Sequence, residues 1–172
     1  RPEIITSCCG ALFSSGEKSL VAGIAALPAV PMKIVFYGSV ALTLASGFFF
    51  YRRGRGGYFF AGMSAATLAV SMLSIISFIS VYFYELPTHR CPFCILQAEY
   101  GYVGYPLYLS LFGASIAGMG VGVLMPFRKI PSLAGTVPSF QKRLALVSLI
   151  LLLVFGIMAT WRMVFTDFIL ES

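Results

Sequence analysis

The sequence predicts an all-α membrane protein, a polytopic bundle of four transmembrane helices preceded by an N-terminal segment that caps its outer face. Hydrophobic residues make up 59% of the 172 residues. Only 10% are charged, whereas soluble domains carry about 25%. The mean hydropathy is +0.91. Four apolar runs are long enough to cross the hydrocarbon core of a bilayer, which takes about 20 helical residues.

Residues 1–32 form the cap in this interpretation, and residues 33–172 form the bundle. The apolar stretch 19–31 is short and contains two prolines, so we expect either an interfacial or re-entrant helix or a plain linker there. The spans are expected at about 33–51, 58–84, 101–127 and 144–165. Aromatic residues gather at their ends, as is typical of helices anchored at the two membrane interfaces. Residues 131–138 predict a flexible loop before the last span.

Small residues recur inside the predicted spans. Gly118 and Gly122 are four residues apart, a spacing that places them on one face of a helix. Such pairs let two helix backbones approach closely. We expect them to pack against another helix of the same chain rather than against a second copy.

The basic residues give the orientation. The connection after the first span and the connection after the third contain seven basic residues and no acidic one. These are Arg52, Arg53, Arg55, Arg128, Lys129, Lys142 and Arg143. The positive-inside rule therefore places both connections in the cytoplasm, and both termini and the loop 85–99 on the other side. Because these charges lie beside apolar runs, the net charge of +6 predicts contact with membrane lipid and not with nucleic acid.

Four cysteines form two pairs on the non-cytoplasmic side. Cys91 and Cys94 have the CxxC spacing at the start of the third span, and Cys8 is adjacent to Cys9. Disulfides form and persist in that compartment. At a helix N-terminus the helix dipole and the unpaired N–H groups lower the pKa of a thiol. The CxxC is a redox pair or part of a metal site, and its position favours redox chemistry, because a thiol one turn into the bundle can meet a quinone dissolved in the bilayer.

Other polar residues near the CxxC are candidates for the same site. His89 precedes it by two residues and adds a hydrogen-bond donor or a positive charge. Gln97 and Glu99 follow it and are placed to handle protons. Arg162 lies inside the last apolar run. It either snorkels to the interface, pairs with an acid of the loop 85–99, or binds a quinone carbonyl.

The segment Cys91-Pro92-Phe93-Cys94-Ile95-Leu96-Gln97-Ala98, at the outer end of a span, resembles the active-site helix of the vitamin K epoxide reductase family. It is also similar to the quinone-coupled bacterial disulfide-bond oxidase, which shares a four-helix architecture with that family. The order of elements agrees, with an outer cysteine pair, two spans, the CxxC and two further spans. The family separates its outer cysteines by several residues, whereas they are adjacent here.

The resemblance implies a multi-pass thiol-disulfide oxidoreductase of the bacterial inner membrane. In the family the CxxC reduces a quinone, either ubiquinone or menaquinone. The outer pair passes electrons to it from a thioredoxin-like or other extracytoplasmic thiol protein. Cys94 would then face the quinone, and Cys91 would exchange disulfides with Cys8 or Cys9. The candidate quinone-binding residues are His89, Gln97 and Arg162.

The adjacent cysteines leave other interpretations open. Together with the CxxC and His89 they suit soft ions such as copper or mercury, which prefer thiolate ligands. A zinc or iron–sulfur site built from the same residues is another metal interpretation. Alternatively, the chain is a structural subunit of a larger membrane complex, and disulfides staple the cap to the bundle.

The charge distribution makes a testable prediction about topology. A cysteine introduced next to Arg53, or in place of Ser132, should be shielded from a membrane-impermeant thiol reagent in intact cells, because both positions lie in the basic connections. Reduced Cys91 and Cys94 should be labelled. Labelling of the two basic connections instead would reverse the orientation and place the CxxC in a reducing compartment.

Overall fold

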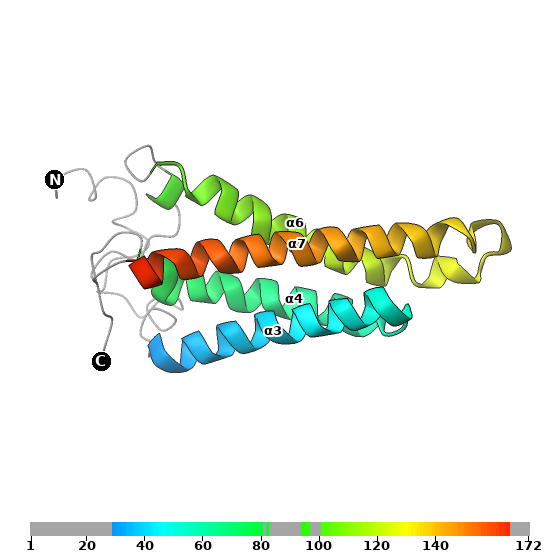
Figure 1. Cartoon of the computed structure of the whole chain (residues 1–172), viewed down its shortest axis with the longest axis horizontal. Coiled ribbons are helices and arrows are strands. Elements are labelled where there is room, and N and C mark those ends of the chain that lie inside the picture. The colour runs from blue at the N-terminus through cyan, green and yellow to red at the C-terminus, as the bar shows by residue number, and fades with distance from the viewer. Residues whose placement is uncertain (1–28, 81, 83–93, 97–100, 166–172) are drawn as a thin grey trace, which may run out of the picture.

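A computed structural model of the chain describes residues 29–80, 82, 94–96 and 101–165. Four long helices run side by side along its length (Figure 1). They are α3 (Ala29–Arg53), α4 (Gly57–Ser74), α6 (Gly104–Val123) and α7 (Thr136–Phe165). All four are long and apolar enough to cross a membrane. The predicted fold class, an all-α bundle of four transmembrane helices, is confirmed.

Shorter elements complete the described chain. α4 continues into the π-helical segment η1 (Ile75–Ile79). The 3-10 turn η2 (Cys94–Leu96) precedes α6, and two more 3-10 turns, η4 (Pro126–Lys129) and η5 (Pro131–Leu133), lead into α7.

Two helices begin earlier than the sequence predicted. α7 begins at Thr136, so the expected loop 131–138 is partly helical. α3 begins at Ala29 and thus includes residues 29–32, which we had assigned to the cap. In both cases a proline, Pro31 or Pro138, lies in the first turn. A proline is tolerated there because the first N–H groups of a helix have no partner within it.

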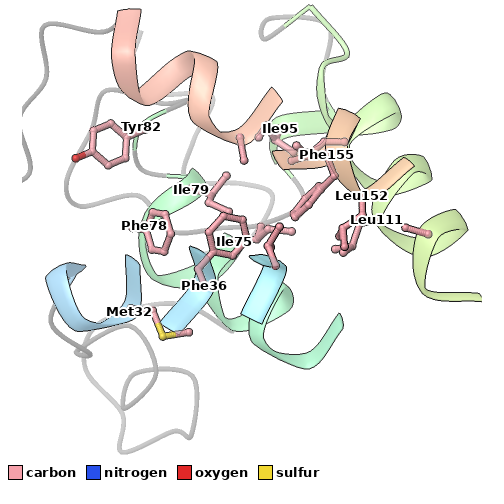
Figure 2. Close-up of a cluster of buried hydrophobic side chains, with 14 residues drawn as sticks. Met32, Phe36, Ile75, Phe78, Ile79, Tyr82, Ile95, Leu111, Leu152 and Phe155 are labelled. Atoms are coloured by element: carbon pink, nitrogen blue, oxygen red, sulfur yellow. The ribbon is translucent and has the colours of Figure 1, made fainter. Parts of the chain in front are cut away.

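The larger part of the core lies toward the end where α3 begins and α7 ends. Its buried side chains come from α3, α6, α7, η1 and η2, and α4 adds partly buried ones (Figure 2). They include Met32, Phe36, Ile75, Phe78, Ile79, Tyr82, Ile95, Leu111, Leu152 and Phe155. Phe36 packs edge-on against Phe78 and Phe155, each with ring centroids 5.9 Å apart. We call this set the cluster of Phe36.

The opposite end is held by polar contacts between the two connections. The Arg128 guanidinium donates from Nη1 to the carbonyl of Gly54 at 2.7 Å and from Nε to Oε1 of Gln141. Fully buried Gln141 donates from Nε2 to the carbonyl of Val121 at 2.9 Å. Arg128 also lies 5.5 Å from the ring centre of Phe50. Both basic connections are therefore at one end of the bundle, away from the cluster of Phe36.

α4 and α6 approach each other closely at two glycines. A Cβ at Gly118 would lie 2.7 Å from the Cβ of Ser64, and one at Gly122 would lie 2.5 Å from the Cβ of Ala61. Distances this short are not tolerated between carbon atoms, so only glycine fits. Because Ser64 and Ala61 belong to the same chain, the predicted internal packing of the glycine pair is confirmed.

We expect Gly118→Ala to lower the free energy of unfolding by about 1–3 kcal/mol, because the added methyl group overpacks the α4–α6 contact. Gly62→Ala on α4 is the matched control, because a Cβ there meets no atom within 4 Å. The control should be neutral or stabilising, since alanine favours helix over glycine. Thermal unfolding of both variants in detergent measures the difference. Equal stability would mean that the two helices can separate without cost.

Candidate functional site

The turn η2 places part of the CxxC on the bundle. Cys94 begins η2, and the next residue, Ile95, is fully buried in the cluster of Phe36. Leu96 is half-buried against the same cluster. Figure 1 shows this turn at the end of the bundle opposite the connections α3–α4 and α6–α7. Cys94 therefore stands at the apolar end of the core.

A close contact with α6 holds the turn. A Cβ at Gly104 would lie 2.6 Å from Cγ2 of Ile95 and 2.8 Å from the carbonyl oxygen of the same residue. Glycine at the first position of α6 thus lets the backbone of η2 lie directly against the helix. The side chain of Ile95, which faces Gly104, is fully buried and anchors the turn in the core.

The expected placement of Cys94 one turn inside the third span is wrong. Cys94 belongs to η2, whereas the spanning helix α6 begins at Gly104. Gly101 and Tyr102 both have positive φ angles, 66° and 56°. Consecutive left-handed residues cannot continue a right-handed helix, so the turn and α6 are separate elements.

Most other predicted site residues lie outside the described part of the chain. These are Cys8, Cys9, His89, Cys91 and Gln97. Arg162 lies near the end of α7, on the η2 side of the bundle, and its side chain is outside the described set. Within the ranges 29–80, 82, 94–96 and 101–165 no group of three metal-ligating side chains occurs. Those ranges exclude every histidine and acidic residue, so the metal alternative stays a prediction.

Lys33 is a polar residue at this end that the sequence interpretation did not use. Its ammonium donates to the Tyr82 hydroxyl at 2.8 Å and lies 4.9 Å from the centre of that ring. Tyr82 belongs to the cluster of Phe36, as does Ile95. A lysine inside an apolar run is a signal for a functional position. This signal is hidden in the sequence because Lys33 is the first residue of the expected span 33–51.

Unpaired serine hydroxyls form a second feature that was missed. The hydroxyls of Ser71, Ser77 and Ser80 are buried and make no hydrogen bond within the described part of the chain, whereas Ser74 donates to the carbonyl of Val70 at 2.8 Å. A buried polar group without a partner costs about 1–3 kcal/mol. Two of the three, Ser77 and Ser80, lie in or next to η1, and π-helical segments frequently occur at functional sites. In the sequence, this feature is indicated by a serine at every third position from 71 to 80.

An apolar groove between α3 and α7 completes the site. It has a volume of about 400 Å³ and is lined among others by Tyr37, Val40, Leu152, Gly156 and Thr160. The hydroxyls of Tyr37 and Thr160 are hydrogen-bonded to each other at 3.0 Å. Val40 and Leu152 also belong to the cluster of Phe36. The groove is therefore continuous with the core on which η2 rests, and its lining suits an alkyl or isoprenoid chain.

Comparison with known proteins finds no matching family model, no matching curated protein and no matching solved structure.

We expect Ser71→Ala to leave the free energy of unfolding unchanged or to raise it by about 1 kcal/mol, because a buried hydroxyl without a partner is removed. Ser74→Ala is the matched control on the same helix, equally buried but hydrogen-bonded. It should lower the free energy of unfolding by about 1 kcal/mol. Thermal unfolding without added ligand compares the two. A larger loss in Ser71→Ala would mean that its hydroxyl is paired in the folded protein.

Proposed function

We propose that this protein is a membrane thiol-disulfide oxidoreductase that passes electrons between protein thiols and a membrane quinone. The observation that supports this most is the position of η2. The turn carries Cys94 at the apolar end of a four-helix bundle, directly against buried core. We propose that a cysteine at this end of the bundle can exchange electrons with both a protein outside the membrane and a quinone within it. This is the position that the resemblance to the vitamin K epoxide reductase family requires of its reactive cysteine.

The opposite end of the bundle supports the choice of compartment. Seven basic residues lie in or beside the two connections there. By the positive-inside rule that end is cytoplasmic, and the turn is then on the oxidising side of the membrane. We therefore propose an inner-membrane protein of bacterial type with its cysteines outside.

The proposed reaction joins two exchanges. Cys91 accepts electrons from Cys8 or Cys9 by thiol-disulfide exchange, after that pair has been reduced by a thioredoxin-like protein. As the thiols of Cys91 and Cys94 close a disulfide, they lose two electrons and two protons, and the quinone takes up both and becomes the quinol. Exchange needs a thiolate, which nearby positive charge favours. Lys33 and the predicted neighbours His89 and Arg162 are the candidates for that charge.

Two separate features of the described residues support the choice of a quinone. A quinone carbonyl accepts hydrogen bonds, and the unpaired buried hydroxyls of Ser71, Ser77 and Ser80 are donors that need an acceptor. The α3–α7 groove offers apolar space of about 400 Å³ for part of an isoprenoid chain. In this proposal the serines bind and orient the ring, and the apolar cluster excludes water from it.

The test is oxidation of the CxxC by quinone. The purified protein, reduced with dithiothreitol and freed of it, should regain the Cys91–Cys94 disulfide when ubiquinone or menaquinone is added, with quinol formed in equal amount. Cys94→Ser should abolish quinol formation and trap a disulfide between Cys91 and Cys8, Cys9 or another protein. Cys91→Ser should trap much less, because in this proposal Cys94 faces the quinone and not the protein partner. Peptide mapping without reductant identifies each disulfide.

Two results would favour the alternatives. One equivalent of copper, mercury, zinc or iron, held while all four thiols stay reduced, would support metal binding. Four cysteines locked in disulfides that quinone neither forms nor restores would support a structural subunit with a stapled cap.

A further inference from the structure

The connection end of the bundle carries a dense and uncompensated positive charge. Its basic residues are Arg52, Arg53, Arg55, Arg128, Lys129, Lys142 and Arg143. Residues 29–80, 82, 94–96 and 101–165 contain no aspartate or glutamate, so none of these side chains has a carboxylate partner among the described residues. Any anion that neutralises them there comes from outside that part of the chain.

Two of these arginines are arranged on the outer surface of α3. The Arg52 guanidinium lies 5.7 Å from the ring centre of Phe48, and that of Arg53 lies 5.0 Å from the ring centre of Phe49. Both rings are exposed, by 55% and 47% of their surface. In a transmembrane helix such rings face lipid. The cation–π contacts hold each guanidinium beside a lipid-facing ring.

Arg128, at the same end of the bundle, has a structural role and serves as a comparison for Arg52 and Arg53. Its guanidinium donates to the Gly54 carbonyl and to Gln141, and it packs over Phe50, whose ring is fully buried. Arg128 thus points into the protein. Arg52 and Arg53 make no hydrogen bond of this kind among the described residues, and their aromatic supports are on the outside.

We propose that Arg52 and Arg53 form a binding site for the headgroup of an anionic phospholipid, with Phe48 and Phe49 contacting its acyl chains. The last turn of a transmembrane helix lies at the depth of the lipid phosphates. A guanidinium presents several N–H donors in a planar fork that matches phosphate oxygens. Basic residues at this depth attract the anionic lipids of the cytoplasmic leaflet. The site therefore does not depend on the redox function.

The test is lipid retention by the full chain in detergent, measured by native mass spectrometry with phosphatidylglycerol and phosphatidylcholine as probes. The unaltered protein should retain phosphatidylglycerol more tightly than phosphatidylcholine. Each basic side chain near an anionic surface is worth about a fivefold change in affinity. R52Q/R53Q should therefore weaken phosphatidylglycerol binding by about 25-fold and leave phosphatidylcholine binding unchanged.

The control variant K142Q/R143Q removes the same charge from exposed positions on α7, where no ring lies under the cation in the described chain. Its loss should stay within about threefold. F48L/F49L keeps the charge and should lose part of the affinity. Equal losses in the two charge variants would overturn the site in favour of diffuse attraction. Two results with the unaltered protein would also overturn the proposed site. These are equal retention of the two lipids, and displacement of phosphatidylglycerol by millimolar inorganic phosphate.

Discussion

The close approach of α4 and α6 is the constraint on which the rest of the bundle depends. Inside a bilayer the helices gain little from hiding apolar surface, because lipid is as apolar as they are. What remains is contact between the helices and pairing of their polar groups. Gly118 brings α6 so near to α4 that a Cβ there would lie 2.7 Å from the Cβ of Ser64 and 3.1 Å from Oγ of Ser148 on α7. A larger residue at position 118 would force the hydroxyls of Ser64 and Ser148 apart.

This approach explains how so many hydroxyl groups can lie inside an apolar bundle. Thr43 and Thr67, from α3 and α4, are 2.6 Å apart and satisfy each other. Ser148 of α7 donates to the carbonyl of Ala114 on α6 at 2.7 Å. These bonds join different helices and are short because the backbones are close. The unpaired hydroxyls of Ser71, Ser77 and Ser80 depart from that rule, and this is why they are informative.

The sequence predicted the features that follow from composition and from local spacing. Apolar runs of about 20 residues gave the four helices, because no other unbroken structure satisfies its backbone in lipid. The glycine pair gave the internal α4–α6 contact. The predicted starts of the helices were less accurate. A proline in the sequence indicates a helix break, but the first turn of α3 and of α7 accepts one. Buried Gln141, in the second turn of α7, is hydrogen-bonded to Arg128 and to the carbonyl of Val121, and such contacts between distant residues have no local pattern in the sequence.

The candidate site was predictable only in part. The CxxC spacing indicated a reactive turn, but Cys94 lies in η2 rather than in α6, because the positive φ angles of Gly101 and Tyr102 separate the two. No local pattern marks a tyrosine, such as Tyr102, that adopts this conformation. The contact of Lys33 with Tyr82 joins residues 49 positions apart, a distance at which sequence periodicity carries no information.

The π-helical segment η1 sets the angular position of Ser80 and Tyr82 relative to α4. The bond from the N–H of Ser80 to the carbonyl of Ile75 spans five residues instead of four. One extra residue is therefore held in that turn, and each residue of an α-helix rotates by about 100°. The face on which Tyr82 meets Lys33 is thus one residue out of phase with the face that Thr67 shares with Thr43. A single-residue deletion between positions 75 and 79 would rotate Tyr82 by about 100° about the helix axis and break its contact with Lys33. Chain length in this turn is therefore under tighter constraint than the identity of its apolar side chains.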